Sequence, residues 1–219
     1  MLSLHQELLL LAINDQGDIE FTAGTSTFRL AFVGACIITL EQDGYLECSL
    51  DKVRVIATNT APDPTLALVL TKINESPSAQ RLRYWLSALQ EDFEMLMKLT
   101  LKSLCDLGVL TIEESRFFWV LSSRRYPIAD GKEKKEAKLR IFAVLFSSDT
   151  PSAEDSVLIG LARTGGLLEA FLTTSEIANL ETRIEEVRNL DKTAGLVEKA
   201  IQEEQEAIAR AMLASPYPV

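Results

Sequence analysis

The chain has 219 residues, of which 47% are hydrophobic, so it can bury one sizeable core and fits one domain better than two. The net charge of −10 argues against attraction of the whole molecule to nucleic acid or to an anionic membrane, so any anion site must be local. Three cysteines, odd in number and set among apolar residues, indicate buried reduced thiols in a cytosolic protein.

The first third of the chain is predicted to contain two apolar helices followed by a short hairpin. Ser3 begins a leucine-rich helix that is too short to span a membrane, and Gly17 ends it. A second helix, capped by Thr25 or Thr27, is apolar nearly all round and therefore belongs at the centre of the protein. The Asp43-Gly44 turn then leads into strands expected at residues 45–50 and 53–58.

Helices and a second hairpin are predicted for the middle of the chain. A short apolar helix covers 65–73, and an amphipathic one covers 78–89, with Trp85 on its buried side. The helical pattern continues to Gly108, after which strands are expected at 117–121 and 124–128. The charged helix that follows, at 131–146, has an apolar stripe formed by Leu139, Phe142, Ala143 and Phe146.

The last third is predicted to be helical throughout. Residues 153–163 form a second central helix, the pair Gly165-Gly166 breaks the chain, and helices at 169–189 and 193–213 follow. The predicted fold is therefore mainly α. It is a single-domain helical bundle, residues 1–219, built around central apolar helices and carrying short β-hairpins.

Sequence motifs typical of enzymes are missing. His5, the single histidine, lies in the first turn of an apolar helix without a second His or a Cys at metal-ligand spacing, so we expect a partly exposed structural residue. There is no GxSxG, no GxxxxGKS and no GxGxxG after a strand. We therefore expect a protein that is not an enzyme and holds no metal and no cofactor.

Positive charge is concentrated in residues 124–140. This window holds seven basic and three acidic residues, so its net charge is +4 and the net charge of the rest of the chain is −14. Such clusters are attracted to anionic membrane surfaces by about 1 kcal/mol per charge. The alternative is a solvated helix face stabilised by pairs such as Glu136 with Arg140.

The predicted second hairpin combines arginines with aromatic residues, as is typical of the boundary between membrane and water. Arg124 and Arg125 are its candidate anion-binding residues. The hairpin residues expected to contact a membrane or another subunit are Phe117, Phe118, Trp119 and Tyr126.

The order of these segments resembles the bacterial branch of the Golgi phosphoprotein 3 family. The resemblance covers nearly the whole chain, although no single motif is as specific as a metal-ligand pattern. It rests on the opening helix Leu2–Ala12, the segments Gly34–Leu40, Asp43–Leu46 and Tyr84–Leu86, and the run from Leu99 to Asp130 that ends in Arg-Arg-Tyr-Pro-Ile.

The resemblance implies peripheral membrane binding. Eukaryotic members bind phosphatidylinositol 4-phosphate through one Trp and three Arg, whose positions here fall near Gly24, on Val33, and on Glu94 and Met97. None of these positions keeps its family residue. Arg29 lies one turn before Val33 and Lys98 one turn after Glu94, so a shifted anion site would use Arg29 and Lys98, the alternative being two ordinary surface cations.

Two functions therefore follow from the sequence. The first is a cytoplasmic, peripheral membrane adaptor that binds an anionic lipid headgroup or membrane surface, with weak or altered lipid binding. The second is a soluble interaction module that forms a homo-oligomer through its hairpin, as the family's equivalent hairpin does. A winged-helix DNA-binding protein also has a helix, a Gly turn and a hairpin, but the charge of −10 counts against a nucleic-acid partner.

Overall fold

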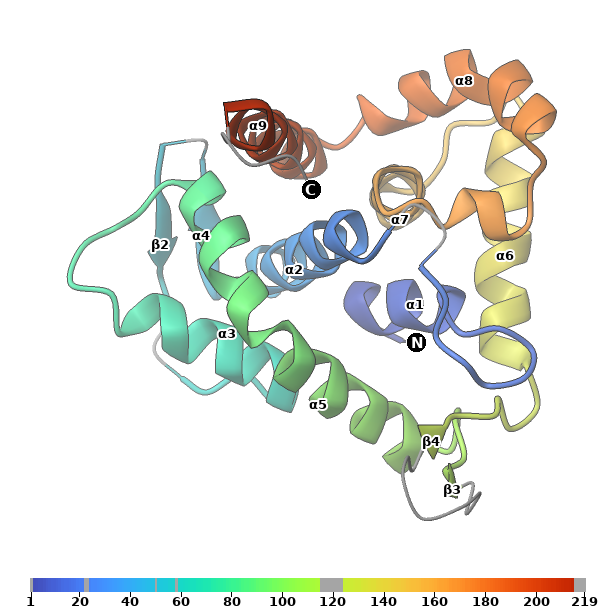
Figure 1. Cartoon of the computed structure of the whole chain (residues 1–219), viewed down its shortest axis with the longest axis horizontal. Coiled ribbons are helices and arrows are strands. Elements are labelled where there is room, and N and C mark those ends of the chain that lie inside the picture. Colours follow the sequence, from blue (N-terminus) through green and yellow to red (C-terminus); the bar gives the residue numbers. More distant parts are fainter. Residues whose placement is uncertain (1, 22–23, 50, 58, 115–123, 215–219) are drawn as a thin grey trace.

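Helices make up most of the protein, as the sequence predicted (Figure 1). The computed structural model describes all residues except 1, 22–23, 50, 58, 115–123 and 215–219. The α-helices are α1 (Leu4–Leu11), α2 (Thr25–Gln42), α3 (Pro64–Asn74), α4 (Leu82–Ala88), α5 (Phe93–Asp106), α6 (Lys132–Leu145), α7 (Ala153–Thr164), α8 (Thr174–Arg188) and α9 (Lys192–Ala214). Short 3-10 helices lie at Leu89–Asp92 and Leu168–Ala170.

The centre of the protein is formed by α2 and α7, which confirms the predicted core. Every residue from Leu30 to Leu40 is buried, and so is every residue from Ser156 to Ala162. In Figure 1 these two helices lie between α3, α4 and α5 on one side and α6 and α8 on the other. In each helix the buried run is long enough to cover every side, so neighbouring elements pack all round it.

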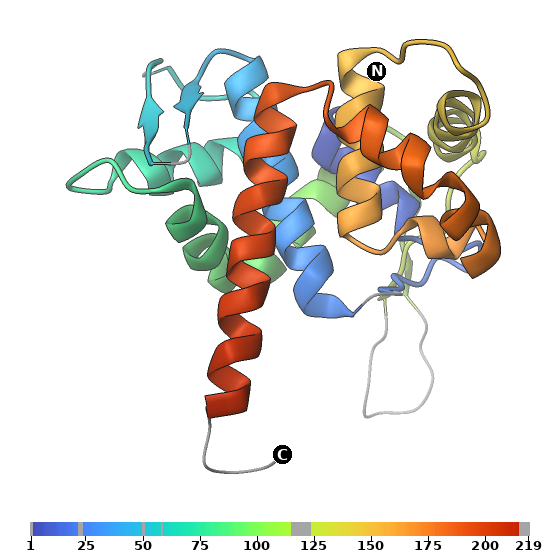
Figure 2. The ribbon, with the colours of Figure 1, turned by 90° about the horizontal axis from the view of Figure 1, so that it is seen from above.

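Two small antiparallel sheets lie at the margins of the helices. In the first, β1 (Leu46–Cys48) pairs with β2 (Val53–Val55), shorter than the predicted strands. In the second, β3 (Glu113–Glu114) pairs with β4 (Arg124–Arg125). The predicted strand at 117–121 lies outside the described residues. Figure 2 places β3 and β4, the N-terminus of α2 and the C-terminus of α9 towards the same side of the molecule.

Some predicted helix ends were wrong, and hydrogen bonds explain two of them. Residue 80 is not helical, because its carbonyl accepts from the N–H of Val53 at 2.8 Å and so joins this residue to β2. α4 therefore begins at Leu82, after the predicted start at residue 78. The helix expected at 169–189 starts at Thr174, because Thr173 and Glu176 form a reciprocal capping box there.

The first loop also differs from its prediction. α1 ends at Leu11, so Gly17 lies in the following loop and does not end the helix. The expected caps Thr25 and Thr27 lie inside the first turn of α2, and Gly24 takes the capping position instead.

The apolar stripe predicted for α6 does not face the core. The helix buries Ala137, Ile141, Val144 and Leu145, which lie on the opposite side from the predicted stripe. Of that stripe, Leu139, Ala143 and Phe146 are exposed and Phe142 is half-buried. Both sides of this helix therefore carry apolar side chains.

None of the described helices combines the length and the apolar composition needed to cross a membrane.

Candidate functional site

Arg29, the first predicted anion-binding residue, is engaged by α5. Its Nη2 donates to Oε1 of Glu94 at 3.2 Å, and its guanidinium carbon lies 5.0 Å from the centre of the Phe93 ring. The side chains of Arg29 and Glu94 are 35% and 62% exposed, so this pair contributes no more than about 1 kcal/mol to stability. The carboxylate of Glu94 nevertheless neutralises the positive charge of Arg29, which an anion would need.

The neighbouring positions add few donors for an anion. Lys98 is exposed on α5, one turn beyond Glu94, and forms no ion pair with any residue that the structure describes. Val33 is fully buried in the core and Met97 is half-buried against it. The structure thus brings Arg29 to Glu94, whereas Lys98 is exposed on the same helix without an ion pair and Lys102 is exposed but paired with Asp106, among the residues that the structure describes.

The base of the second hairpin is tied to the loop between α1 and α2. Arg125 Nε donates to Asp18 Oδ1 at 3.2 Å, and the N–H of Tyr126 donates to the carbonyl of Gly17 at 2.8 Å. Tyr126 is half-buried against the core. Arg124 pairs through its backbone with Glu114 in β3; its side chain, like the candidates Phe117, Phe118 and Trp119, lies outside the described residues.

The cations of α6 divide into buried, paired and exposed ones. Lys134 is buried, donates to the carbonyl of Ile13 and lies 3.8 Å from Asp15 Oδ1. Desolvation lowers the pKa of Lys134, helped by the nearby charge of Lys138 and opposed by Asp15. Lys132 and Lys135 are exposed and form no ion pair within the described parts of the chain. These two lysines are therefore the part of the α6 charge that a partner could use.

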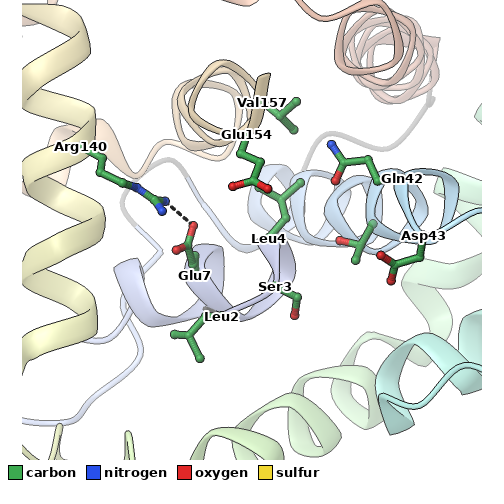
Figure 3. A pocket seen from close by; sticks show the side chains of 10 residues that line it. Leu2, Ser3, Leu4, Glu7, Gln42, Asp43, Arg140, Glu154 and Val157 are labelled. Carbon is green, nitrogen blue, oxygen red and sulfur yellow. Dashed lines mark hydrogen bonds and ion pairs between the residues drawn. The ribbon is translucent and has the colours of Figure 1, made fainter. Parts of the chain in front are cut away.

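A pocket of about 260 Å³ lies where α1 meets the C-terminus of α2 and the N-terminus of α7 (Figure 3). Its polar lining includes the carboxylates of Glu7, Asp43 and Glu154 and the guanidinium of Arg140. Arg140 extends from α6 towards Glu7, whereas Glu154 comes from α7 (Figure 3). With three carboxylates against one guanidinium, this pocket does not suit an anionic headgroup.

Arg140 joins three helices at the edge of this pocket. Its Nη2 donates to Glu7 Oε2 at 2.6 Å, and its Nε lies 3.1 Å from Asp155 Oδ1 without an aligned hydrogen bond. Burial raises the pKa of Glu7, and the hydrogen bond and charge of Arg140 act in the opposite direction. The predicted pairing of Arg140 with Glu136 is replaced by these contacts with α1 and α7.

Replacing Arg140 with methionine should therefore destabilise the protein in a pH-dependent way. Without the guanidinium, the pKa of Glu7 rises further above its ordinary value, so the folded state favours the protonated carboxyl group. The loss of unfolding free energy should be roughly 1–3 kcal/mol at neutral pH. It should shrink as the pH falls from the raised pKa of Glu7 in the variant to that in the wild type, both above the ordinary value, because a protonated Glu7 does not need the cation.

Urea unfolding of the wild type and of Arg140→Met, at neutral pH and near pH 4, measures this difference. Lys135→Met, on the same helix but exposed, is the control and should leave the unfolding free energy nearly unchanged. An equal loss for Arg140→Met at both pH values would contradict the role given to Glu7.

His5 belongs to a buried polar network, so the prediction of a partly exposed residue was wrong. Its side chain is fully buried, with Nδ1 3.2 Å from Ser3 Oγ and Nε2 3.5 Å from Asp63 Oδ1. Asp63 caps α3 by accepting from the N–H groups of Thr65 and Leu66 at 2.8 and 3.1 Å. Burial alone would raise the pKa of Asp63, but His5 and these N–H groups hold it below its ordinary value. The network thus fastens α1 to α3.

The thiols of this protein are poorly suited to nucleophilic chemistry. Cys36 is buried, and Cys48 and Cys105 are half-buried, so the prediction of buried thiols holds fully only for Cys36. Burial raises the pKa of Cys48 to about 12 and raises the pKa values of the other two thiols as well. Across the residues that the structure describes, no cluster of His, Cys, Asp and Glu side chains is arranged to hold a metal ion.

Sequence reasoning missed the Arg140 contacts and the pocket beside them. Glu7 and Arg140 are 133 positions apart, so no local spacing links them. The only signal was a charged residue, Glu7, within an otherwise leucine-rich helix, which points to a buried partner without naming it.

Comparison with known protein families supports the resemblance seen in the sequence. Residues 4–204 match the family Golgi phosphoprotein 3 (GPP34), from the start of α1 into α9. No curated protein matches the chain. Because the family match spans most of the chain, the protein belongs to the Golgi phosphoprotein 3 family.

Proposed function

We propose that the protein is a cytoplasmic, peripheral membrane adaptor that binds anionic lipid surfaces weakly and without preference for a phosphoinositide. The observation that carries this proposal is the basic segment 124–140 on an otherwise acidic chain, in which Lys132 and Lys135 are exposed. Lysines of this kind are attracted to an anionic leaflet over about a Debye length. Membership of the Golgi phosphoprotein 3 family supports the same function.

The residues at the family's phosphoinositide positions argue against a specific headgroup site. A phosphate monoester in a shallow site needs several charge-assisted donors, which bidentate arginines supply. Here Val33 and Met97 supply none, and Glu94 both pairs with Arg29 and repels an anion. Each lost charged hydrogen bond is worth about 1.5–3 kcal/mol, so three would remove most of the roughly 8 kcal/mol of a micromolar site.

Co-sedimentation with vesicles tests this function. We expect binding to phosphatidylcholine vesicles that contain phosphatidylserine, no binding to phosphatidylcholine alone, and loss of binding as salt rises. Replacing part of the phosphatidylserine by phosphatidylinositol 4-phosphate at equal total charge should change little. The pair Arg124→Glu and Arg125→Glu should weaken binding roughly tenfold or more.

The matched control is the pair Arg54→Glu and Arg81→Glu. Both arginines are exposed near β1 and β2, and the pair changes the net charge by the same amount. It should bind vesicles almost as the wild type does. Tight, salt-resistant binding to phosphatidylinositol 4-phosphate would refute the proposed lack of specificity, and absence of binding to every vesicle would favour the soluble interaction module.

A further inference from the structure

The exposed side of α6 carries large apolar side chains that the protein does not cover. Leu139 is 56% exposed and Phe146 is 61% exposed, although Ile141 and Leu145 on the opposite side already bury this helix against the core. Single exposed apolar residues are ordinary, but these two lie two turns apart on one line with Ala143 between them. α6 itself lies at the margin of the protein, on the far side from α3 and α4 (Figure 1).

Aromatic rings extend this exposed side beyond α6. The rings of Phe142 and Phe146 stack with their centres 5.9 Å apart, and Phe171 meets Phe142 edge-on at 5.7 Å. We call the set formed by Leu139, Phe142, Ala143, Phe146 and Phe171 the outer patch. It is continuous along α6 and the segment just after the second 3-10 helix.

Lysines border the outer patch at the N-terminal end of α6 and along its side. Lys132 and Lys135 are exposed within two turns before Leu139, and the exposed acidic residues beside them are Asp130 and Glu136. Lys138 lies over the ring of Phe171, with Nζ 5.4 Å from its centre. Apolar side chains bordered by lysines fit an anionic bilayer, because lysine stems lie along apolar groups while their ammonium groups reach lipid phosphates.

We infer that the outer patch and Lys132 and Lys135 together form the surface by which this protein contacts an anionic membrane. This inference rests on the proposed function and assigns the apolar part of the contact to α6. The positive charge of the lysines that border the outer patch favours anionic lipid over other partners. The patch is also the ridge of a single helix, which can enter the lipid headgroup region without a matching groove. The outer patch has five residues, far fewer than the roughly 20–30 residues that each side of a standard protein–protein interface contributes.

Vesicle binding of two double variants tests this inference. Leu139→Glu with Phe146→Glu should weaken binding to phosphatidylcholine–phosphatidylserine vesicles by roughly tenfold or more, and by a similar factor at every salt concentration at which the wild type still binds. Lys132→Glu with Lys135→Glu should weaken it by a similar factor at low salt, with the difference fading as salt rises. The matched control is Ile56→Glu with Leu190→Glu, two residues of similar exposure elsewhere on the protein, which should have the smaller effect of added negative charge alone.

The outcomes separate this inference from the function on which it rests. If the wild type binds these vesicles and the Leu139–Phe146 variant binds no worse than the Ile56–Leu190 control, the outer patch is not the contact while the proposed function stands. If the wild type binds no vesicle, the proposed function itself fails. A wild-type dimer in solution that the Leu139–Phe146 variant abolishes would overturn the membrane assignment and give the patch to a second copy.

Discussion

Replacing Trp85 with alanine should lower the free energy of unfolding by about 3–5 kcal/mol. Trp85 lies on α4, is only 5% exposed, and has Leu82 and Leu86 as buried neighbours on the same helix. α4 packs against α2 and α9, so a cavity at Trp85 would lie between three helices that close only partly around it. The indole N–H has no hydrogen-bond partner within the described residues, so the expected loss is one of packing.

Denaturant unfolding of Trp85→Ala and of its neighbour Tyr84→Ala measures this loss. Tyr84 is 50% exposed and touches Trp85 edge-on, with the ring centres 5.1 Å apart. Its removal should cost no more than about 1.5 kcal/mol, since it loses one aromatic contact and little burial. Equal losses for the two variants would show that α4 does not anchor the core through Trp85.

The central helices could be predicted because their sequences are apolar on every side. A helix such as α2, buried at each residue from Leu30 to Leu40, can lie only in the middle of a helical protein. The same reasoning placed α7 correctly. Length, apolar composition and turn residues therefore sufficed for the mainly α fold.

The orientation of α6 could not be predicted, because two stripes compete on this helix. Leu139, Ala143 and Phe146 form a better apolar stripe in the sequence than the buried one, which contains Lys134. Lys134 can be buried with the apolar residues of this stripe because its ammonium group donates to the carbonyl of Ile13, a contact between segments far apart in the chain. In the sequence Lys134 argues against burial of that side of α6, and only tertiary contacts explain why the side is buried.

The candidate site was predictable in composition but not in its pairing. The sequence located the basic segment, whereas Arg125 with Asp18, Arg29 with Glu94 and Arg140 with Glu7 are ion pairs between distant segments. Each pair places a carboxylate beside a cation and so weakens the attraction of that cation for an anionic partner. Counting charges along the chain therefore overestimates the positive surface that the fold presents.

Gly17 is the point where the loop after α1 meets the base of the second hairpin, and it leaves no room for a side chain. Its φ of +82° lies in the left-handed region, and a Cβ there would lie 2.6 Å from the nitrogen of Pro127 and 2.8 Å from the carbonyl carbon of Tyr126. These are backbone atoms, which cannot turn away as a flexible side chain could. The carbonyl of Gly17 also accepts the N–H of Tyr126 at 2.8 Å, so the close approach is part of the attachment.

Gly17→Ala should therefore cost roughly 2–5 kcal/mol of unfolding free energy, as the sum of about 1–2 kcal/mol for left-handed strain and about 1–3 kcal/mol for crowding. Gly44→Ala is the matched control, since its φ is +77° but nothing lies within 4 Å of its Cβ position, so it should cost the strain alone. Hydrogen exchange at the Tyr126 amide should also accelerate in Gly17→Ala and stay unchanged in Gly44→Ala. If both variants lost the same stability and Tyr126 stayed protected, the loop would not hold the hairpin base through this contact.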